Sequence, residues 1–198
     1  MSRRKPPKSE ASGLLGPATI SDFDGTLINL DIDWAKLRNQ LGINSLTELW
    51  SESLDGWDLV TRAEVIAAGS STFVTTVISE LHQVEELAIL TDNSIQAVDT
   101  ALERLPWLKE RVRSVVGREV LLGSKWDPAI FTTGFELATS SLLLSSSQSL
   151  PTYVGDSAYE LEYARSLGST VFEVRAGVLL ATDSATDAPS SIHGTSNT

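Results

Sequence analysis

Cysteine is absent from this chain of 198 residues, and positive charge is scarce in it. Without thiols the protein can form neither disulfide bonds nor thiolate metal sites, and the lack of cysteine favours a cytoplasmic location. No apolar run is long enough to cross a bilayer, so we expect no membrane partner. Residues 2–8 are basic but lack the apolar stretch of a signal peptide; organelle targeting by this segment stays open.

The 15 Lys and Arg residues are outnumbered by 26 Asp and Glu residues, which leaves a formal net charge of −11. Such a surface would repel a phosphate backbone, so we expect no nucleic-acid partner. A small phosphorylated metabolite is compatible with this charge, because a metal and one or two local cations can hold it. The length and the 41% hydrophobic content predict one globular domain with a modest insertion.

Short apolar segments alternate with helical patterns along most of the chain. This alternation predicts an α/β fold, a Rossmann-like doubly wound parallel sheet with helices on both faces. Strands are expected at 17–24, 87–90, 112–116, 152–154 and, as the last strand, 171–174; helices at 95–105, from Asp127-Pro128 towards 140, and at 158–167. The predicted organisation is a flexible tail (1–15), a core (16–30 and 67–180), a small helical cap (31–66) and a disordered tail (181–198).

The predicted cap interrupts the alternation soon after the first strand. Trp34, Leu37 and Leu41 recur at helical spacing, and Gly42 is suited to end the helix. A second helical piece follows from Ser45, and three of the five tryptophans fall in the segment. We therefore expect a compact helical insertion that lies over a functional site.

Asp22 and Asp24 come directly after the first apolar strand and are followed by Gly25-Thr26. Two like charges about 4 Å apart repel by about 4 kcal/mol at an effective dielectric of 20. A pair of this kind is typical of sites where a cation offsets the repulsion. One carboxylate can act as a nucleophile and the other as a general acid and then a base.

Polar residues also follow two other predicted strands. Asp22, Thr91 and Asp156 each stand at a strand end, and parallel sheets bind ligands beyond these ends where the strand order reverses. Asp156 could join Asp22 on Mg²⁺, Thr91 could donate a hydrogen bond to a phosphoryl oxygen, and Lys125 could supply positive charge.

Each residue also has a purely structural interpretation. Thr91-Asp92-Asn93 or Asp156 could cap the helix that follows. Lys125 could be a solvated lysine. The stretch from Ser157 to Glu160 fits a capping box, which would give Glu160 a structural role only.

Together, Asp22-Phe23-Asp24-Gly25-Thr26-Leu27, Thr91, Lys125 and Gly155-Asp156-Ser157 with Glu160 resemble the four motifs of the haloacid dehalogenase (HAD) superfamily. The resemblance covers about residues 17–175, and the insertion resembles the helical cap of the phosphoglycolate-phosphatase-like branch. It implies a Mg²⁺-dependent phosphomonoester hydrolase that forms an aspartyl-phosphate. The implied roles are nucleophile for Asp22; acid and base for Asp24; phosphate binding for Thr91, Asp92 and Lys125; Mg²⁺ binding for Asp22, Asp156 and the backbone carbonyl of Asp24; and support for Gly25, Thr26, Gly155, Ser157 and Glu160.

The sequence departs from the family pattern at three positions. Asp92 stands where Asn is usual, Trp126 where Pro is common, and Glu160 where Asp is commoner. Dehalogenases of the superfamily lack the second acid of the first motif, so Asp24 favours phosphoryl transfer. The alternatives are a phosphomutase, which would need a cap cation such as Lys36, Arg38 or Arg62 for a second phosphate, and a low-turnover binding or assembly protein.

Overall fold

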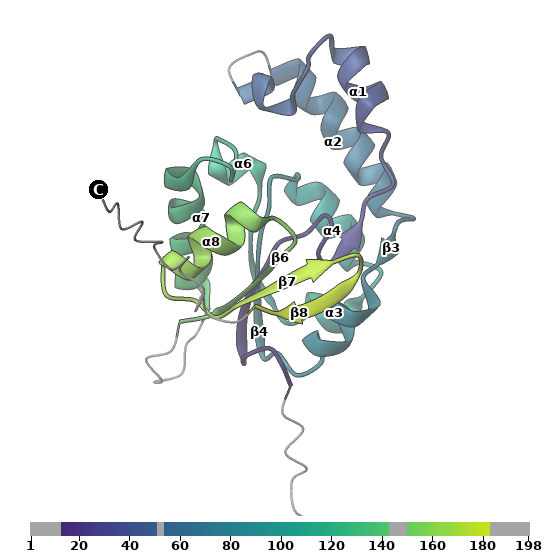
Figure 1. The fold of residues 1–198 in the computed structure, drawn as a ribbon. Coiled ribbons are helices and arrows are strands. Elements are labelled where there is room, and N and C mark those ends of the chain that lie inside the picture. Colours follow the sequence, from purple (N-terminus) through teal and green to yellow (C-terminus); the bar gives the residue numbers. More distant parts are fainter. Residues whose placement is uncertain (1–12, 51–53, 143–149, 183–198) are drawn as a thin grey trace, which may run out of the picture.

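The computed structural model describes residues 13–50, 54–142 and 150–182, which fold around a six-stranded sheet (Figure 1). The prediction of an α/β, Rossmann-like fold is confirmed. All neighbouring strands are parallel except the last pair. The strands lie in the order β5 (Val112–Val116), β4 (Glu86–Leu90), β1 (Ala18–Ser21), β6 (Thr152–Gly155), β7 (Val171–Arg175) and β8 (Val178–Ala181). The order turns back at β1, which places the expected ligand crevice at the end of that strand.

Helices cover both faces of the sheet because the central strands are apolar on both sides. Leu87 and Ile89 of β4 face one hydrophobic cluster, and Ala88 and Leu90 face the other. The first cluster is closed by α3 (Thr75–Leu81), α4 (Ile95–Leu102) and α5 (Pro106–Lys109), and the second by α6 (Arg118–Leu121), α7 (Pro128–Ser141) and α8 (Ala158–Ser166).

Local capping signals set two of the helix starts. Asp127 caps α7 by accepting from the backbone N–H of Ala129 (2.8 Å), and Pro128 is the first residue of that helix, as predicted. The cap of α4 is Ser94, whose side chain accepts from the N–H of Ala97 (3.3 Å). The interpretation of Thr91-Asp92-Asn93 as a helix cap is therefore wrong.

Two predicted boundaries differ from the structure by three residues. The first strand ends at Ser21 rather than at residue 24, because the carbonyl of Phe23 accepts from the N–H groups of Leu27 and Ile28 and closes a tight turn. The predicted helix at 95–105 ends at Leu102, and Pro106 begins the separate helix α5.

The last strand is β8, which the sequence analysis did not predict. It pairs with β7 in antiparallel fashion through a two-residue turn at Ala176 and Gly177, whose φ angles are 50° and 76°. Positive φ at both central residues is the geometry of a tight hairpin turn. The predicted last strand at 171–174 is thus the first arm of a hairpin.

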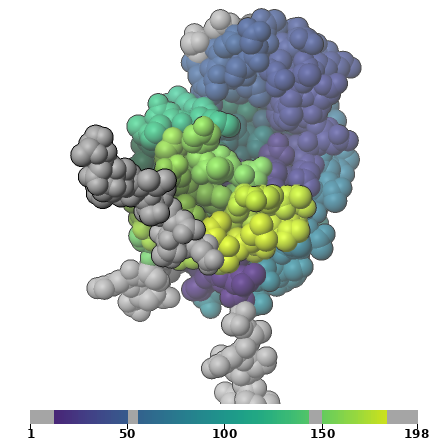
Figure 2. All heavy atoms as spheres, viewed as in Figure 1, coloured from purple at the N-terminus to yellow at the C-terminus, as the bar shows by residue number. Residues whose placement is uncertain are grey.

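The insertion forms a helical cap that stands over one end of the sheet (Figures 1 and 2). It consists of α1 (Trp34–Leu41), the 3₁₀ helix η1 (Leu46–Trp50) and most of α2 (Leu54–Ala68). Gly42 ends α1 in the left-handed conformation (φ 70°), as predicted. The cap has a small cluster of its own, formed by Leu37, Ile43, Leu49 and Val60.

The cap is joined to the core by continuous structure. A two-stranded antiparallel ribbon of β2 (Ile28–Asn29) and β3 (Thr72–Phe73) links the two connecting segments. Ala67 and Ala68, at the end of α2, belong to the core cluster rather than to the cap cluster. One rigid helix therefore runs from the cap into the core.

The predicted tails at 1–15 and 181–198 lie almost wholly outside the described residues. Leu15, at the end of the predicted flexible tail, is described and is buried in the core cluster. In the described part of the chain, no helix has both the length and the apolar character needed to cross a membrane.

Candidate active site

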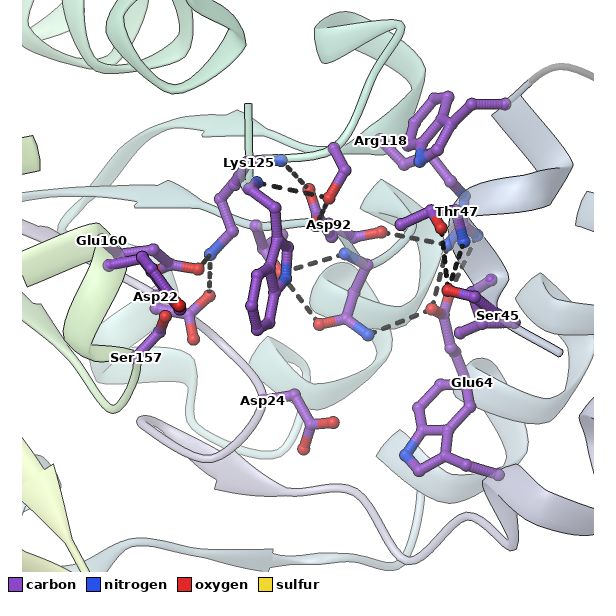
Figure 3. A pocket seen from close by; sticks show the side chains of 18 of the residues that line it. Asp22, Asp24, Ser45, Thr47, Glu64, Asp92, Arg118, Lys125, Ser157 and Glu160 are labelled. Atoms are coloured by element: carbon purple, nitrogen blue, oxygen red, sulfur yellow. Dashed lines mark hydrogen bonds and ion pairs between the residues drawn. The ribbon is translucent and has the colours of Figure 1, made fainter. Parts of the chain in front are cut away.

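A cavity of about 890 Å³ lies between the strand ends and the cap (Figure 3). Most residues that the sequence analysis singled out line it: Asp22, Asp24, Thr91, Asp92, Lys125, Asp156, Ser157 and Glu160. Gly25, Thr26 and Gly155 do not line it. The predicted convergence of the strand ends is therefore found in the structure.

Lys125 lies at the centre of the polar half of the cavity. Its ammonium group donates to Asp22 Oδ1 (2.6 Å) and to the carbonyl of Leu90 (3.2 Å), and it pairs with Glu160 Oε1 (2.9 Å). The residue is only 3% exposed, so the interpretation as a solvated lysine is wrong. Burial opposes the charged form, but the carboxylates of Asp22, Glu160 and Asp92 raise the pKa of Lys125 above its ordinary value.

Glu160 faces the site instead of capping its own helix. Its Oε2 atom accepts from the hydroxyl of Tyr153 (2.6 Å), while Oε1 pairs with Lys125. The N-cap of α8 is Ser157, which makes no side-chain capping bond, so neither the capping box nor a cap by Asp156 forms. Burial and the Glu160 charge raise the pKa of Tyr153, which keeps its hydroxyl protonated as a donor.

Asp22 continues the line of β1 into the cavity. Its N–H donates to the carbonyl of Val154 (2.8 Å), which fixes the backbone beside β6. Burial raises the pKa of Asp22, and the Lys125 ammonium opposes this shift by favouring the carboxylate. The negative charge of the Asp22 carboxylate is thus stabilised by the Lys125 ammonium group.

Asp24 lies apart from this ion pair and faces the cavity from below the cap. Its Oδ1 atom accepts from the N–H of Leu30 (2.8 Å). Burial raises the pKa of Asp24 to about 6, against the effect of that hydrogen bond. A carboxyl group with this pKa can be either a proton donor or an acceptor near neutral pH.

Gly25 allows Asp156 to approach the turn that holds the two acids. Its φ angle is 79°, and a Cβ atom at this position would overlap the carboxyl group of Asp156. Burial and the charge of Glu160 raise the pKa of Asp156. Thr26 is fully buried in the same turn, and its N–H donates to the carbonyl of Phe23 (3.3 Å).

Thr91 and Asp92 form hydrogen bonds within the protein. The Thr91 hydroxyl donates to Asn93 Oδ1 (2.8 Å) and accepts from the N–H of Asn93 (3.1 Å). Asp92 accepts from the N–H of Lys125 (2.8 Å) and from the hydroxyl of Ser124 (2.7 Å). Burial raises the pKa of Asp92. These contacts show that Asp92 fixes the backbone that carries Lys125.

Sequence reasoning missed a buried ion pair between the cap and the core. Glu64 of α2 accepts four hydrogen bonds of 3.0 Å, from Asn93 Nδ2, Ser94 N and the two terminal nitrogens of Arg118 (Figure 3). It is only 1% exposed. No motif marks this residue, since a lone Glu in a helix is usually solvated.

The side chain of Arg118 also contacts three residues besides Glu64. It donates to the carbonyl of Asp92 (3.1 Å) and to the hydroxyl of Thr61 (2.8 Å), and its guanidinium carbon lies 4.2 Å from the ring centroid of Trp57. The network therefore holds α2 of the cap against the loop that carries Thr91 and Asp92.

Aromatic side chains line the cavity together with the polar ones. Trp34, Trp50 and Trp57 line it from the cap, and Trp126 and Tyr159 line it from the core. Arg38 lines the cavity too, whereas Lys36 lines a separate hollow and Arg62 is exposed on α2. Arg38 is thus the one of the three cap cations considered from the sequence that faces the site.

The donor set suits a hard divalent cation. Asp22, Asp156 and the backbone carbonyl of Asp24 are all oxygen donors, and Gly25 lets Asp156 come close to the other two. Among residues 13–50, 54–142 and 150–182, no three His, Asp or Glu side chains gather in a metal-binding cluster. A cation at this place would thus be held by two carboxylates, a carbonyl and water, as is usual for Mg²⁺.

No protein-family model matches the sequence, and no curated protein sequence matches it. Seventy-five solved chains match the structure. One is CbbY from Rhodobacter sphaeroides in complex with phosphate, with a TM-score of 0.56 and 15% identity over 78% of this chain and 84% of that one. Another is L-2-haloacid dehalogenase from Xanthobacter autotrophicus, with a TM-score of 0.52 and 16% identity over 78% of this chain and 76% of that one. A candidate phosphoglycolate phosphatase from Lactobacillus plantarum has a TM-score of 0.52 and 15% identity over 78% of this chain and 84% of that one. At these identities the likeness establishes the fold, which phosphatases and dehalogenases share.

Proposed function

We propose that this protein is a HAD-superfamily phosphatase, a Mg²⁺-dependent hydrolase of a small phosphomonoester that acts through an aspartyl-phosphate on Asp22. The observation that carries this proposal is the pairing of Asp22 with Lys125 at the end of β1, with Asp24 as a second acid in the same cavity. A dehalogenase needs no second acid there, whereas a phosphomonoester needs a proton for its leaving alcohol.

In the first step a carboxylate oxygen of Asp22 attacks phosphorus. The new O–P bond forms as the ester O–P bond breaks, and Asp24 in its acid form protonates the departing alcohol. Lys125 keeps the Asp22 carboxylate oriented. The ammonium group also offsets negative charge on the phosphoryl oxygens.

In the second step Asp24, now a carboxylate, takes a proton from water. The resulting nucleophile attacks phosphorus, the bond to Asp22 breaks, and inorganic phosphate leaves while both acids return to their starting forms. The Thr91 hydroxyl, which lies at the cavity wall, donates to a phosphoryl oxygen by exchanging its bond to Asn93.

Asp22, Asp156 and the backbone carbonyl of Asp24 would hold Mg²⁺. When bound, the cation supplies positive charge that reduces the repulsion between these carboxylates and the phosphate. The charge of Lys125 is already shared between Asp22 and Glu160, so the charge of the cation would help an anionic substrate to enter.

The test is hydrolysis of p-nitrophenyl phosphate with and without Mg²⁺, by the wild type and by Asp22→Asn. We expect Mg²⁺-dependent turnover in the wild type and a loss of at least about 10³-fold in the variant, since the nucleophile is removed. Asp99→Asn, an exposed position on α4, is the matched control and should keep wild-type activity. Near-normal turnover by Asp22→Asn would rule out the covalent mechanism.

A phosphomutase is the second candidate, and the position of Arg38 in the cavity wall favours it. A mutase would pass the phosphoryl group from Asp22 to a free hydroxyl of a sugar monophosphate rather than to water, giving a bisphosphate that returns its other phosphoryl group to Asp22. Phosphate release from a sugar bisphosphate measured beside isomer formation separates the two activities. We expect release of phosphate to dominate, because one cap cation provides a weak site for a second phosphate.

A further inference from the structure

Four of the five tryptophans in the chain line the cavity at the strand ends. Trp34, Trp50 and Trp57 come from the cap and Trp126 comes from the loop beside Lys125, so rings from two parts of the chain line the same cavity. The fifth, Trp107, lies away from the cavity and packs against the core cluster. The proposed phosphoryl transfer uses the polar floor of the cavity and none of these rings.

Trp34 and Trp57 pack in part against the cap cluster, but none of the four rings is fully buried. Trp34, Trp50 and Trp57 are only half-buried, and Trp126 is 60% exposed. Trp126 packs on Tyr159, itself 55% exposed, with ring centroids 5.4 Å apart. Large apolar side chains left open around a cavity typically mark a surface that a ligand covers.

Two of the hydroxyl groups beside these rings are already paired. Those of Ser45 and Thr47 hydrogen-bond each other (2.8 Å). A polyhydroxylated sugar needs several free donors and acceptors, whereas a flat ring needs only faces on which to stack. The chemistry of this part of the cavity therefore favours an aromatic ring over a sugar.

We propose that the leaving alcohol of the substrate carries a flat aromatic ring, which binds between the cap tryptophans and the Trp126–Tyr159 pair. This inference rests on the proposed phosphatase function for the position of the phosphate group, which would lie at Asp22 and Lys125. Figure 3 shows Asp22 and Lys125 on one side of the cavity and the cap residues Ser45 and Thr47 on the other, so a single ester can contact both parts.

The first measurement is calorimetric binding to Asp22→Asn in the presence of Mg²⁺. The probes are 2-phenylethyl phosphate and 2-cyclohexylethyl phosphate, which have equally basic leaving alcohols and similar size but differ in aromatic character. We expect the phenyl ester to bind about fivefold to tenfold more tightly. Adding Trp126→Leu should reduce this ratio by at least half, and adding Trp107→Leu, the matched control outside the cavity, should leave it unchanged.

The second measurement is hydrolysis of both esters by the wild type. Hydrolysis of both with equal kcat/KM, together with equal binding, would overturn the aromatic inference and leave the phosphatase function in place. Preferential binding of the phenyl ester without hydrolysis of either would overturn the phosphatase function and leave the ring site in place. Tighter binding of glucose 6-phosphate than of 2-phenylethyl phosphate would also overturn the aromatic inference.

Discussion

Replacing Glu64 by Leu should destabilise the protein far more than any surface change. The substitution removes the acceptor of four hydrogen bonds and leaves the Arg118 guanidinium, itself only 5% exposed, without its counter-charge. Breaking a buried ion pair by removing one partner costs about 3–5 kcal/mol. We expect the upper part of this range, because Asn93 and Ser94 lose their acceptor as well.

The double variant Glu64→Leu/Arg118→Met tests whether the effect comes from the unpaired charge. Apolar residues of similar size in place of both partners of a buried pair are often close to neutral. We therefore expect the double variant to be at least about 2 kcal/mol more stable than the sum of the two single changes predicts. Arg113→Met is the matched control, since the Arg113–Glu86 pair (3.1 Å) is partly exposed and should be worth at most about 1 kcal/mol.

The assay is urea unfolding followed by tryptophan fluorescence and, independently, by circular dichroism. If Glu64→Leu costs no more than Arg113→Met, or if the single changes simply add in the double variant, the network does not hold the cap to the core. Activity provides a second readout, because Glu64 positions Asn93 and Asn93 positions Thr91. We expect a lower kcat in Glu64→Leu at temperatures where the variant is fully folded.

Three further substitutions test the site. Gly25→Ala should abolish most activity, because its Cβ would displace Asp156. Gly42→Ala is the control, since Gly42 has a similar φ but open space around it; this variant should lose only about 1 kcal/mol of stability and keep its turnover. Lys125→Met leaves Asp22 and Glu160 without their shared cation, so urea unfolding should show a loss of about 3–5 kcal/mol and turnover should fall to background. Asp24→Asn should slow alkyl esters about 10²–10⁴-fold and p-nitrophenyl phosphate far less in rapid-mixing kinetics; equal losses would contradict its role as the acid.

Features that depend on neighbours along the chain could be predicted from the amino-acid sequence. Apolar runs predicted the parallel strands, and Asp127-Pro128 and Gly42 marked the ends of helices, because strand burial and helix capping act over a few residues. Asp22 and Asp24 were found in the same way, since a charged pair at the end of an apolar strand is a local pattern. The hairpin of β7 and β8 was not predicted, because Ala176 and Gly177 were not recognised as a turn between two apolar strands.

The pairing of the polar side chains could not be predicted, because it depends on how distant segments of the chain pack. Lys125 and Asp22 are 103 positions apart and Arg118 and Glu64 are 54 apart, and no local pattern shows that such charges will meet. The role of Glu160 was likewise open, because its spacing from Ser157 fits a helix cap equally well. Burial settled it: once α8 packs against β6, the Glu160 carboxylate lies where Tyr153 and Lys125 can donate to it, and water is excluded from competing.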